Sequence, residues 1–278
     1  MALADRDVAI VQSPTMGGGP SVDLMHSFVR DVCGGERVLL GHCLPGPLES
    51  EIVVLGSHGT VSRVVVNAAF QVQWTCRIQK LDAQCLWTAA CVASADGGQL
   101  LRATLGDQAG TMWAYVLRGK CTAGASADET TAEERKCPKC HEGMIFAIIP
   151  WKGHLLSASD DRSIARWNEN MECVHRWFGH MSRIWDLVVM PSGALLSCGE
   201  DTTVRVWNID TGTLVALLEG HQGRNVWRAA VDAHENVIAS CGDDGCIKLH
   251  DWQHRQLRPT IGMWMSVPSG RVRRCHHD

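Results

Sequence analysis

Histidine, serine and aspartate side chains recur together in the second half of the chain, at a spacing that could support chemistry. Each of three histidines, His141, His180 and His221, is followed by a serine and then by an aspartate. Histidines in such a set could be catalytic or could bind a metal ion. His141 also follows the string Cys137-Pro138-Lys139-Cys140, which has the two-residue gap of half a zinc site. The elements that carry these residues determine whether their role is chemical or structural.

The spacing inside the three copies is regular. An aspartate stands six residues before the closing position of each copy, and a serine stands four residues before that aspartate. Buried polar side chains must be paired, so partners at a repeated spacing favour structural sets over catalytic or metal-binding histidines. The recurring residues form three candidate structural sets, and the last is in doubt because His250 stands at its closing position unless Trp252 takes that place: His141, Ser157, Asp161 and Trp167; His180, Ser197, Asp201 and Trp207; and His221, Ser240 and Asp244.

The three copies resemble WD repeats. Each is preceded by a His with Gly beside it, and they end in LLSASDDRSIARWN (155–168), LLSCGEDTTVRVWN (195–208) and VIASCGDDGCIKLHD (237–251). A period of about 40 residues that opens with Gly-His and closes near Trp-Asp is typical of a WD-repeat β-propeller. Each repeat is a four-stranded blade that is stable only when it stacks on neighbours. The resemblance implies an all-β fold and a tetrad in which Asp accepts from His, His reaches Ser, and Ser reaches the Trp indole.

Two more blades are expected upstream from weaker patterns. Residues 52–66 have the rhythm of a two-stranded hairpin around a Gly-Ser-His-Gly turn. Leu86-Trp87 is expected at the position that Ile184-Trp185 and Val226-Trp227 hold in later blades. The next blade is expected to use three strands, at 86–94, 99–107 and 111–119.

The expected organisation is an unassigned head (1–36), propeller blades (37–252) and an unpatterned tail (253–278). The small, polar and acidic residues of 119–136 predict a disordered insertion between blades. About five blades are legible, which is fewer than a single-chain propeller of this kind usually needs to close. We therefore expect an incomplete propeller and favour a fragment of a longer protein.

Composition restricts the class of protein. Of the 278 residues, 45% are hydrophobic, as in a globular protein, and the net charge of −4 argues against nucleic-acid binding through bulk charge alone. No apolar run reaches the length of about 18 residues that a membrane span needs. The first residues lack the basic-then-apolar order of a signal peptide. Thirteen cysteines, an odd number, then indicate reduced thiols in the cytosol or nucleus, and we expect a cytoplasmic protein.

Other arrangements of reactive residues give no catalytic or cofactor site. Gly17-Gly18-Gly19 is not followed by the Lys-Ser/Thr of a phosphate loop, and no Gly-x-Ser-x-Gly turn is present. A full zinc site at Cys137 and Cys140 needs a second ligand pair, for which Cys121 and Cys173 are the nearby candidates. We expect loop thiols there, no metal, no cofactor and no enzyme.

Two arginines occupy the same place in adjacent repeats. Arg183 and Arg224 each stand three residues after the repeat histidine, at the start of the innermost strand, and Arg228 follows on the same strand as Arg224. Guanidinium groups at that end of neighbouring blades would form a positive ring suited to phosphate or acidic side chains. Ordinary solvated arginines are the alternative.

Several strings go beyond the generic repeat and resemble the first propeller of the WD-repeat-containing protein 6 family. They lie within 39–252: LLGHC (39–43), 52–66, 141–146 leading to 159–164, 179–185 leading to 199–201, and 220–224. The resemblance implies a non-catalytic partner of a tRNA 2′-O-methyltransferase that modifies the wobble nucleotide of the anticodon. It also implies that the methyl donor and the catalytic residues belong to that partner, and that tRNA is positioned through the complex.

Two other functional classes stay open. The first is a generic WD adaptor such as a substrate receptor of a ubiquitin ligase, although the repeats end in Trp167-Asn168 and Trp207-Asn208 without the Trp-Asp-x-Arg ending that such receptors share. The second is a metal-dependent enzyme built on Cys137 and Cys140.

Overall fold

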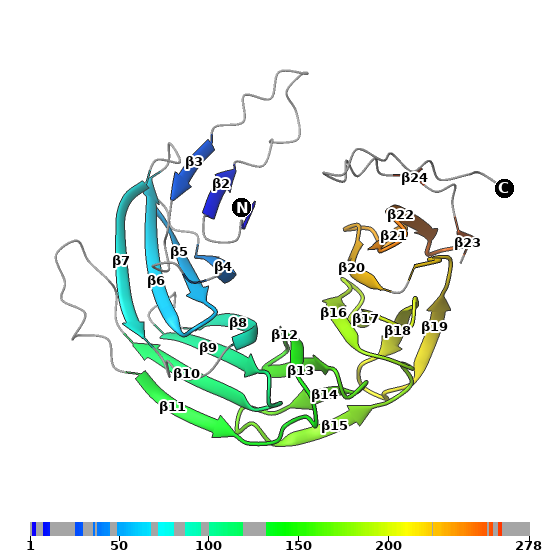
Figure 1. Ribbon diagram of the computed structural model, residues 1–278, viewed down its shortest axis with the longest axis horizontal. Coiled ribbons are helices and arrows are strands. Elements are labelled where there is room, and N and C mark those ends of the chain that lie inside the picture. Colours follow the sequence, from blue (N-terminus) through cyan, green and yellow to red (C-terminus); the bar gives the residue numbers. More distant parts are fainter. Residues whose placement is uncertain are drawn as a thin grey trace. The chain divides into compact units, whose positions relative to one another are not determined.

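The computed structural model describes residues 2–3, 8–11, 26–29, 36, 38–44, 49–67, 72–80, 87–95, 100–118, 132–223, 225–254, 256–257 and 261–262. These residues form antiparallel sheets without a helix (Figure 1). None of them belongs to a helix that is long and apolar enough to cross a membrane. The chain divides into two compact units, residues 1–138 and residues 139–278. The predicted all-β propeller fold is confirmed by blade-like sheets in both units.

Unit 1 contains one small sheet and two four-stranded blades. The small sheet lies in the unassigned head and pairs β1 (Ala2–Leu3), β2 (Val8–Val11) and β3 (His26–Val29). The first blade runs in sequence order through β4 (Val38–Leu44), β5 (Glu49–Gly56), β6 (Thr60–Asn67) and β7 (Val72–Lys80). The second contains β8 (Trp87–Ala95), β9 (Leu100–Asp107), β10 (Met112–Arg118) and β11 (Ala132–Cys137).

The disordered insertion predicted for 119–136 is wrong at its C-terminal end. Residues 132–136 belong to β11, which pairs with β10 from Met112↔Cys137 to Leu117↔Ala132. The sequence is polar there because β11 is the last strand of its sheet, where Arg135 and Lys136 are exposed. Lys136 also places its Nζ 4.2 Å from the Trp113 ring centroid. Residues 119–131 lie outside the described residues.

Unit 2 contains three consecutive blades. The first has β12 (Ile145–Trp151), β13 (His154–Ser159), β14 (Ile164–Trp167) and β15 (Cys173–Trp177). The second has β16 (Ile184–Val189), β17 (Ala194–Gly199), β18 (Val204–Asn208) and β19 (Leu214–Leu218). The third has β20 (Val226–Val231), β21 (Val237–Gly242), β22 (Cys246–Asp251), β23 (Gln256–Leu257) and β24 (Ile261–Gly262).

The tail was expected to lack strands, and this expectation is wrong for two short segments. Both β23 and β24 pair with β22, through His250↔Leu257 and Ile247↔Ile261 respectively. Two strands of two residues each replace one outer strand, so no continuous alternation marks them in the sequence.

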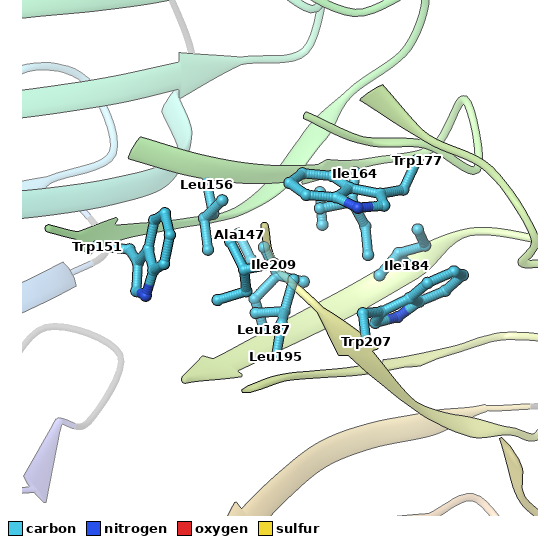
Figure 2. Packing of buried hydrophobic residues seen from close by; sticks show 11 residues of the cluster. Ala147, Trp151, Leu156, Ile164, Trp177, Ile184, Leu187, Leu195, Trp207 and Ile209 are labelled. Carbon is cyan, nitrogen blue, oxygen red and sulfur yellow. The ribbon is translucent and has the colours of Figure 1, made fainter. Parts of the chain in front are cut away.

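The blades of unit 2 bury their apolar faces against each other. One cluster joins the β12–β15 blade to the β16–β19 blade, and Figure 2 shows Ile164 beside the Trp177 indole and Ile184 between the indoles of Trp177 and Trp207. A second cluster, which includes Leu196 and Val226, joins the β16–β19 blade to the β20–β24 blade. Because each cluster takes residues from two sheets, neither sheet could cover its apolar face alone.

The turns between the second and third strands of the five described blades share one backbone feature. One residue of each turn has positive φ, and these residues are Gly59, Gly110, Arg162, Thr202 and Gly245. The shared turn aligns the blades independently of sequence. On that alignment Trp87 pairs with Asp107 as Ile184 pairs with Gly199. The predicted register was therefore off by one residue, because Trp87 takes the place of Ile184 and not of Trp185.

Candidate interaction site

The polar set around His180 is closed by hydrogen bonds. His180 Nδ1 lies 2.9 Å from Asp201 Oδ2, and His180 Nε2 lies 2.7 Å from Ser197 Oγ. The Trp207 indole N–H donates to Ser197 Oγ at 2.8 Å. An ionised carboxylate only accepts, so Nδ1 carries the proton, Nε2 accepts from the serine hydroxyl, and the serine accepts from the indole. The structure thus brings all four sequence-predicted residues together.

Ionisation in this set follows from burial and hydrogen bonding. Burial lowers the pKa of His180, and the hydrogen bond to Asp201 only partly offsets this. Burial would raise the pKa of Asp201, but hydrogen bonds from His180, the Met181 N–H and Thr203 hold that pKa well below its usual range. A neutral imidazole therefore faces an ionised carboxylate.

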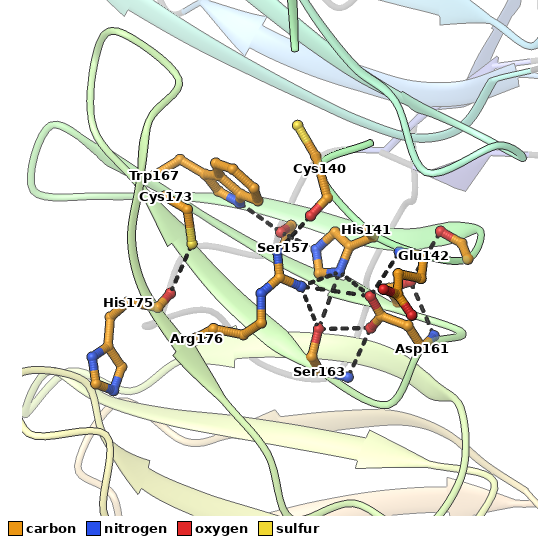
Figure 3. A network of polar contacts seen from close by, with 12 residues as sticks. Cys140, His141, Glu142, Ser157, Asp161, Ser163, Trp167, Cys173, His175 and Arg176 are labelled. Atoms are coloured by element: carbon orange, nitrogen blue, oxygen red, sulfur yellow. Dashed lines mark hydrogen bonds and ion pairs between the residues drawn. The ribbon is translucent and has the colours of Figure 1, made fainter. Parts of the chain in front are cut away.

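The His141 set has the same geometry, and an arginine faces its carboxylate as Arg205 faces Asp201 at 3.6 Å (Figure 3). His141 lies 2.9 Å from Asp161 and 2.7 Å from Ser157, and Trp167 donates to Ser157 at 2.8 Å. Arg176, from β15, donates to the Cys140 carbonyl at 2.5 Å and lies 3.5 Å from the Asp161 carboxylate. Burial opposes ionisation of Asp161, but the hydrogen bonds from His141 and Ser163 outweigh burial and hold the pKa of Asp161 well below its usual range.

These contacts match the Ser–His–Asp order of a hydrolase triad, but the serines cannot act as nucleophiles. Ser157 and Ser197 are 0% and 1% exposed, so no substrate carbonyl reaches either Oγ. An indole N–H also occupies each Oγ as a fixed donor. The arrangement is therefore structural: a chain of hydrogen bonds links the turn to the strands of the blade.

Gly179, which precedes His180, is required for a steric reason. Gly179 has φ +154°, and a Cβ there would lie 2.8 Å from Cη2 of Trp207. The loop therefore passes directly over the tetrad indole, which only glycine permits.

The third set is present without its tryptophan. His221 lies 3.0 Å from Asp244 and 2.9 Å from Ser240. His250 pairs with Ile238 as Trp207 pairs with Leu195, so it holds the tryptophan position. Burial, followed by repulsion from His221 and Lys248, lowers the pKa of His250 to about 4. Trp252 does not take over that position: it packs on the apolar cluster around Leu196, with its backbone N–H 2.8 Å from the Asn236 carbonyl.

Unit 1 uses carboxylates that sequence reasoning missed. Glu36 accepts from the backbone N–H groups of His58 and Thr60, across the β5–β6 turn. Asp107 accepts from the Thr111 N–H at 2.8 Å and from the Trp113 indole at 3.2 Å. The six-residue gap from Asp107 to Trp113 was the available signal, whereas nothing in the sequence marked Glu36.

The proposed half zinc site is not a pair of free thiols. Cys137 and Cys140 are each disulfide-bonded, so neither sulfur is available as a thiolate ligand. The expectation of reduced thiols is wrong for these two, while Cys173, Cys198 and Cys241 are free. Within the described parts of the chain, no group of three or more His, Cys, Asp or Glu side chains could hold a metal ion.

The loops around the repeat histidines form one face of unit 2, which we call the loop face. Backbone hydrogen bonds close it in each blade: Asp160 N–H to Met144 O, Glu200 N–H to Arg183 O, and Asp243 N–H to Asn225 O. The two described arginines of the predicted ring, Arg183 and Arg228, are both paired with carboxylates. Arg183 Nε lies 2.5 Å from Asp160 and 3.7 Å from Glu200. Arg228 lies 2.8 Å from Asp186, and Arg224 lies outside the described residues.

Three aromatic side chains, one near the start of each inner strand of unit 2, form a row. The pairing register of β12, β16 and β20 skips one residue each time, and the skipped residues are Phe146, Trp185 and Trp227. Such bulges free a side chain from the ladder and re-aim it. The Phe146 and Trp185 ring centroids are 4.4 Å apart, and those of Trp185 and Trp227 are 4.8 Å apart. We call these three residues the aromatic row.

Sequence reasoning placed Ile184-Trp185 and Val226-Trp227 at equivalent positions of their blades but did not foresee that the aromatic rings meet. Hydrogen bonds fix the two indoles: Trp185 donates to Asn225 Oδ1 at 2.9 Å, and Trp227 donates to Asp243 Oδ1 at 2.5 Å. Asn225 Nδ2 donates to the other oxygen of Asp243 at 2.5 Å. Trp227 is 42% exposed, so the row ends in an open indole on the loop face.

With this geometry established, comparison with known proteins identifies the repeats. Residues 171–208 and 212–251 match the family described as WD domain, G-beta repeat. The chain therefore contains WD repeats. Each match begins just before the outer strand of one blade and ends at the last residue of the third strand of the next blade. Each sequence repeat therefore contributes strands to two sheets.

Curated relatives match only part of the chain. The tRNA (34-2'-O)-methyltransferase regulator WDR6 of Rattus norvegicus is 31% identical over 119 residues, which are 39% of this chain and 10% of that protein. The F-box/WD repeat-containing protein sel-10 of Caenorhabditis elegans is 37% identical over 109 residues, 36% of this chain and 17% of that protein. The matched region thus spans about a tenth to a sixth of these relatives' length.

Among solved structures, the WD40 β-propeller domain of Doa1 superimposes with a TM-score of 0.57 at 20% identity. The superposition covers 82% of this chain and 73% of that one. At this identity the likeness supports the propeller fold alone.

Proposed function

We propose that this chain belongs to a non-catalytic WD-repeat scaffold that docks a tRNA 2′-O-methyltransferase and helps present tRNA to it. The partial similarity to a protein named as a regulator of such an enzyme supports the specific partner. The buried state of every Ser–His–Asp set in unit 2 supports a scaffold over an enzyme, because the residues that resemble a catalytic triad are used up by the fold. The proposal includes a cytoplasmic location.

The observation that carries the scaffold role is the loop face. Its ordered loops hold an open indole, and its described arginines Arg183 and Arg228 are matched by carboxylates. Paired guanidinium groups favour contact with protein over contact with phosphates, since a phosphate would have to displace Asp160 or Asp186. Contact with tRNA is therefore expected to come mainly through the enzyme partner. Arg224, together with Arg183 and Arg228 once a phosphate displaces their carboxylate partners, is expected to add to that contact.

The test is reconstitution with the full-length protein. The purified protein should transfer no methyl group alone and should increase methylation of nucleotide 34 when the methyltransferase is added. Capture of the methyltransferase should survive the triple change of Arg183, Arg224 and Arg228 to glutamate if the enzyme docks elsewhere on the blades. A full-length protein that neither captures the methyltransferase nor alters its activity would refute the proposal.

A generic adaptor of a ubiquitin ligase is the second candidate, favoured by the 37% identity to a protein named as an F-box/WD repeat protein. Co-purification of ubiquitin-ligase subunits, without a methyltransferase, would support this candidate instead.

A further inference from the structure

The Trp227 end of the aromatic row combines two features that the fold itself does not require. Trp227 is 42% exposed, whereas the tetrad indoles of Trp167 and Trp207 are each 3% exposed. Asp243 beside it is also exposed. An indole left partly in solvent at the end of the aromatic row offers exposed ring surface, which core packing does not use.

The described residues place a carboxylate at this end. Among them, the side-chain hydrogen-bond partners of Asp243 are Asn225 and Trp227, which are both neutral, so no described cation pairs with Asp243. The nearby cation of Arg228 is engaged by Asp186 at 2.8 Å, on the neighbouring inner strand. The carboxylate and the indole are held against each other by the indole N–H, which fixes their relative position.

An indole face next to a carboxylate selects cations. A lysine ammonium or arginine guanidinium over a tryptophan face is attracted by the ring quadrupole, and tryptophan is the best aromatic residue for this contact. The carboxylate adds Coulomb attraction and a hydrogen-bond acceptor. A phosphate would be repelled by Asp243, and a purely apolar side chain would leave the carboxylate less hydrated.

We propose that Trp227 and Asp243 form a docking subsite for a lysine or arginine side chain presented by a protein partner. The rest of the aromatic row supports the subsite: Trp185 packs against Trp227 at a tilt of 40°, and Asn225 bridges the Trp185 indole to Asp243. The β-bulge takes Trp227 out of the strand ladder. This inference deepens the proposed scaffold function, on which it rests, by naming the chemistry of the partner segment.

The direct test uses the full chain and short labelled peptides of equal length in a glycine–serine frame, carrying two arginines, two lysines or two glutamates. Fluorescence anisotropy at low salt should show binding of the arginine and lysine peptides and much weaker binding of the glutamate peptide. Asp243→Asn and Trp227→Leu should each weaken binding of the arginine peptide about threefold to tenfold. Trp227→Phe keeps a ring face and should weaken it less.

The matched control is Asp210→Asn, which removes the same charge from an exposed turn after β18, where Asp210 lies 3.8 Å from Arg166. This variant should bind as the original chain does. Equal binding of the arginine and glutamate peptides, or equal losses in Asp243→Asn and Asp210→Asn, would overturn the proposal. Melting curves check that each variant is folded. If Trp227→Leu does not fold, Trp227→Phe still tests the contribution of the indole.

The subsite and the proposed function can fail separately. Peptide binding requires no methyltransferase, so failure to capture that enzyme would leave the subsite intact. Conversely, a methyltransferase captured equally well by the original full-length protein and by its Asp243→Asn and Trp227→Leu variants would preserve the proposed function and overturn the subsite as its docking point.

Discussion

Replacing Asp201 with alanine tests whether the buried sets stabilise the blades. Asp201 accepts hydrogen bonds from His180 Nδ1 at 2.9 Å, from the Met181 N–H at 2.9 Å and from the Thr203 hydroxyl at 2.8 Å. His180 is 5% exposed, so water cannot easily replace the lost acceptor. An unpaired buried donor costs about 1–3 kcal/mol, and the more exposed donors add less, which gives a total loss of about 2–4 kcal/mol.

This loss is measurable by calorimetry or by circular dichroism during heating. For a domain of this size, 1 kcal/mol corresponds to a Tm change of roughly 3 °C, so Asp201→Ala should lower Tm by roughly 6–12 °C. Asp201→Asn keeps one acceptor oxygen and should recover part of the loss. The control Asp210→Ala removes an exposed carboxylate and should change stability by less than about 0.5 kcal/mol. A Tm for Asp201→Ala equal to that of the control would refute the assigned role.

Three further predictions concern other positions. His250→Trp should make unfolding less sensitive to acid. The pKa of His250 is lowered to about 4 in the folded state, so its contribution to stability is complete above the unfolded pKa near 6.5 and is lost as pH falls toward 4. Over that pH range Tm should therefore fall less in the variant than in the original chain. Cys198 should react with iodoacetamide far more slowly than Cys173, because burial shields its thiol and raises its pKa, and mass spectrometry of a timed reaction would detect equal rates if this is wrong. Arg183→Glu should cost at most about 1 kcal/mol, since its partners are solvent-accessible, and the loss should shrink at high salt; a salt-independent loss would contradict it.

The architecture was predictable because its signals repeat. The Asp–Trp gap, the serine before it and the preceding histidine recur with one period, and the structure joins them in the same order at His141 and His180. A pattern that recurs reports a local geometry that each blade needs. The upstream strands were found in the same way, from alternating apolar runs such as 52–66.

Features that occur once, or that depend on two distant segments, could not be predicted. Glu36 precedes β4, and its carboxylate accepts hydrogen bonds from a turn more than twenty residues later in the chain. Sequence spacing gives no signal for such a contact. Pairing of β11 was hidden by its polar composition, since an outer strand has little apolar surface to bury. The aromatic row depends on a skipped residue in each of three strands, which side-chain periodicity alone obscures.

The skipped residue at the start of each inner strand has a consequence for how such proteins diversify. The same irregularity occurs in unit 1, where the register skips Leu39 in β4 and Thr88 in β8. The residue at this position is skipped in the strand ladder and lies outside the tetrad. Its side chain makes separate contacts, such as the hydrogen bond from the Thr88 hydroxyl to the Gly106 carbonyl at 3.2 Å, so it can be exchanged without altering the tetrad. The five described blades thus carry Leu, Thr, Phe, Trp and Trp at this one position, and a designer could change the side chain there while keeping the tetrad residues of the repeat.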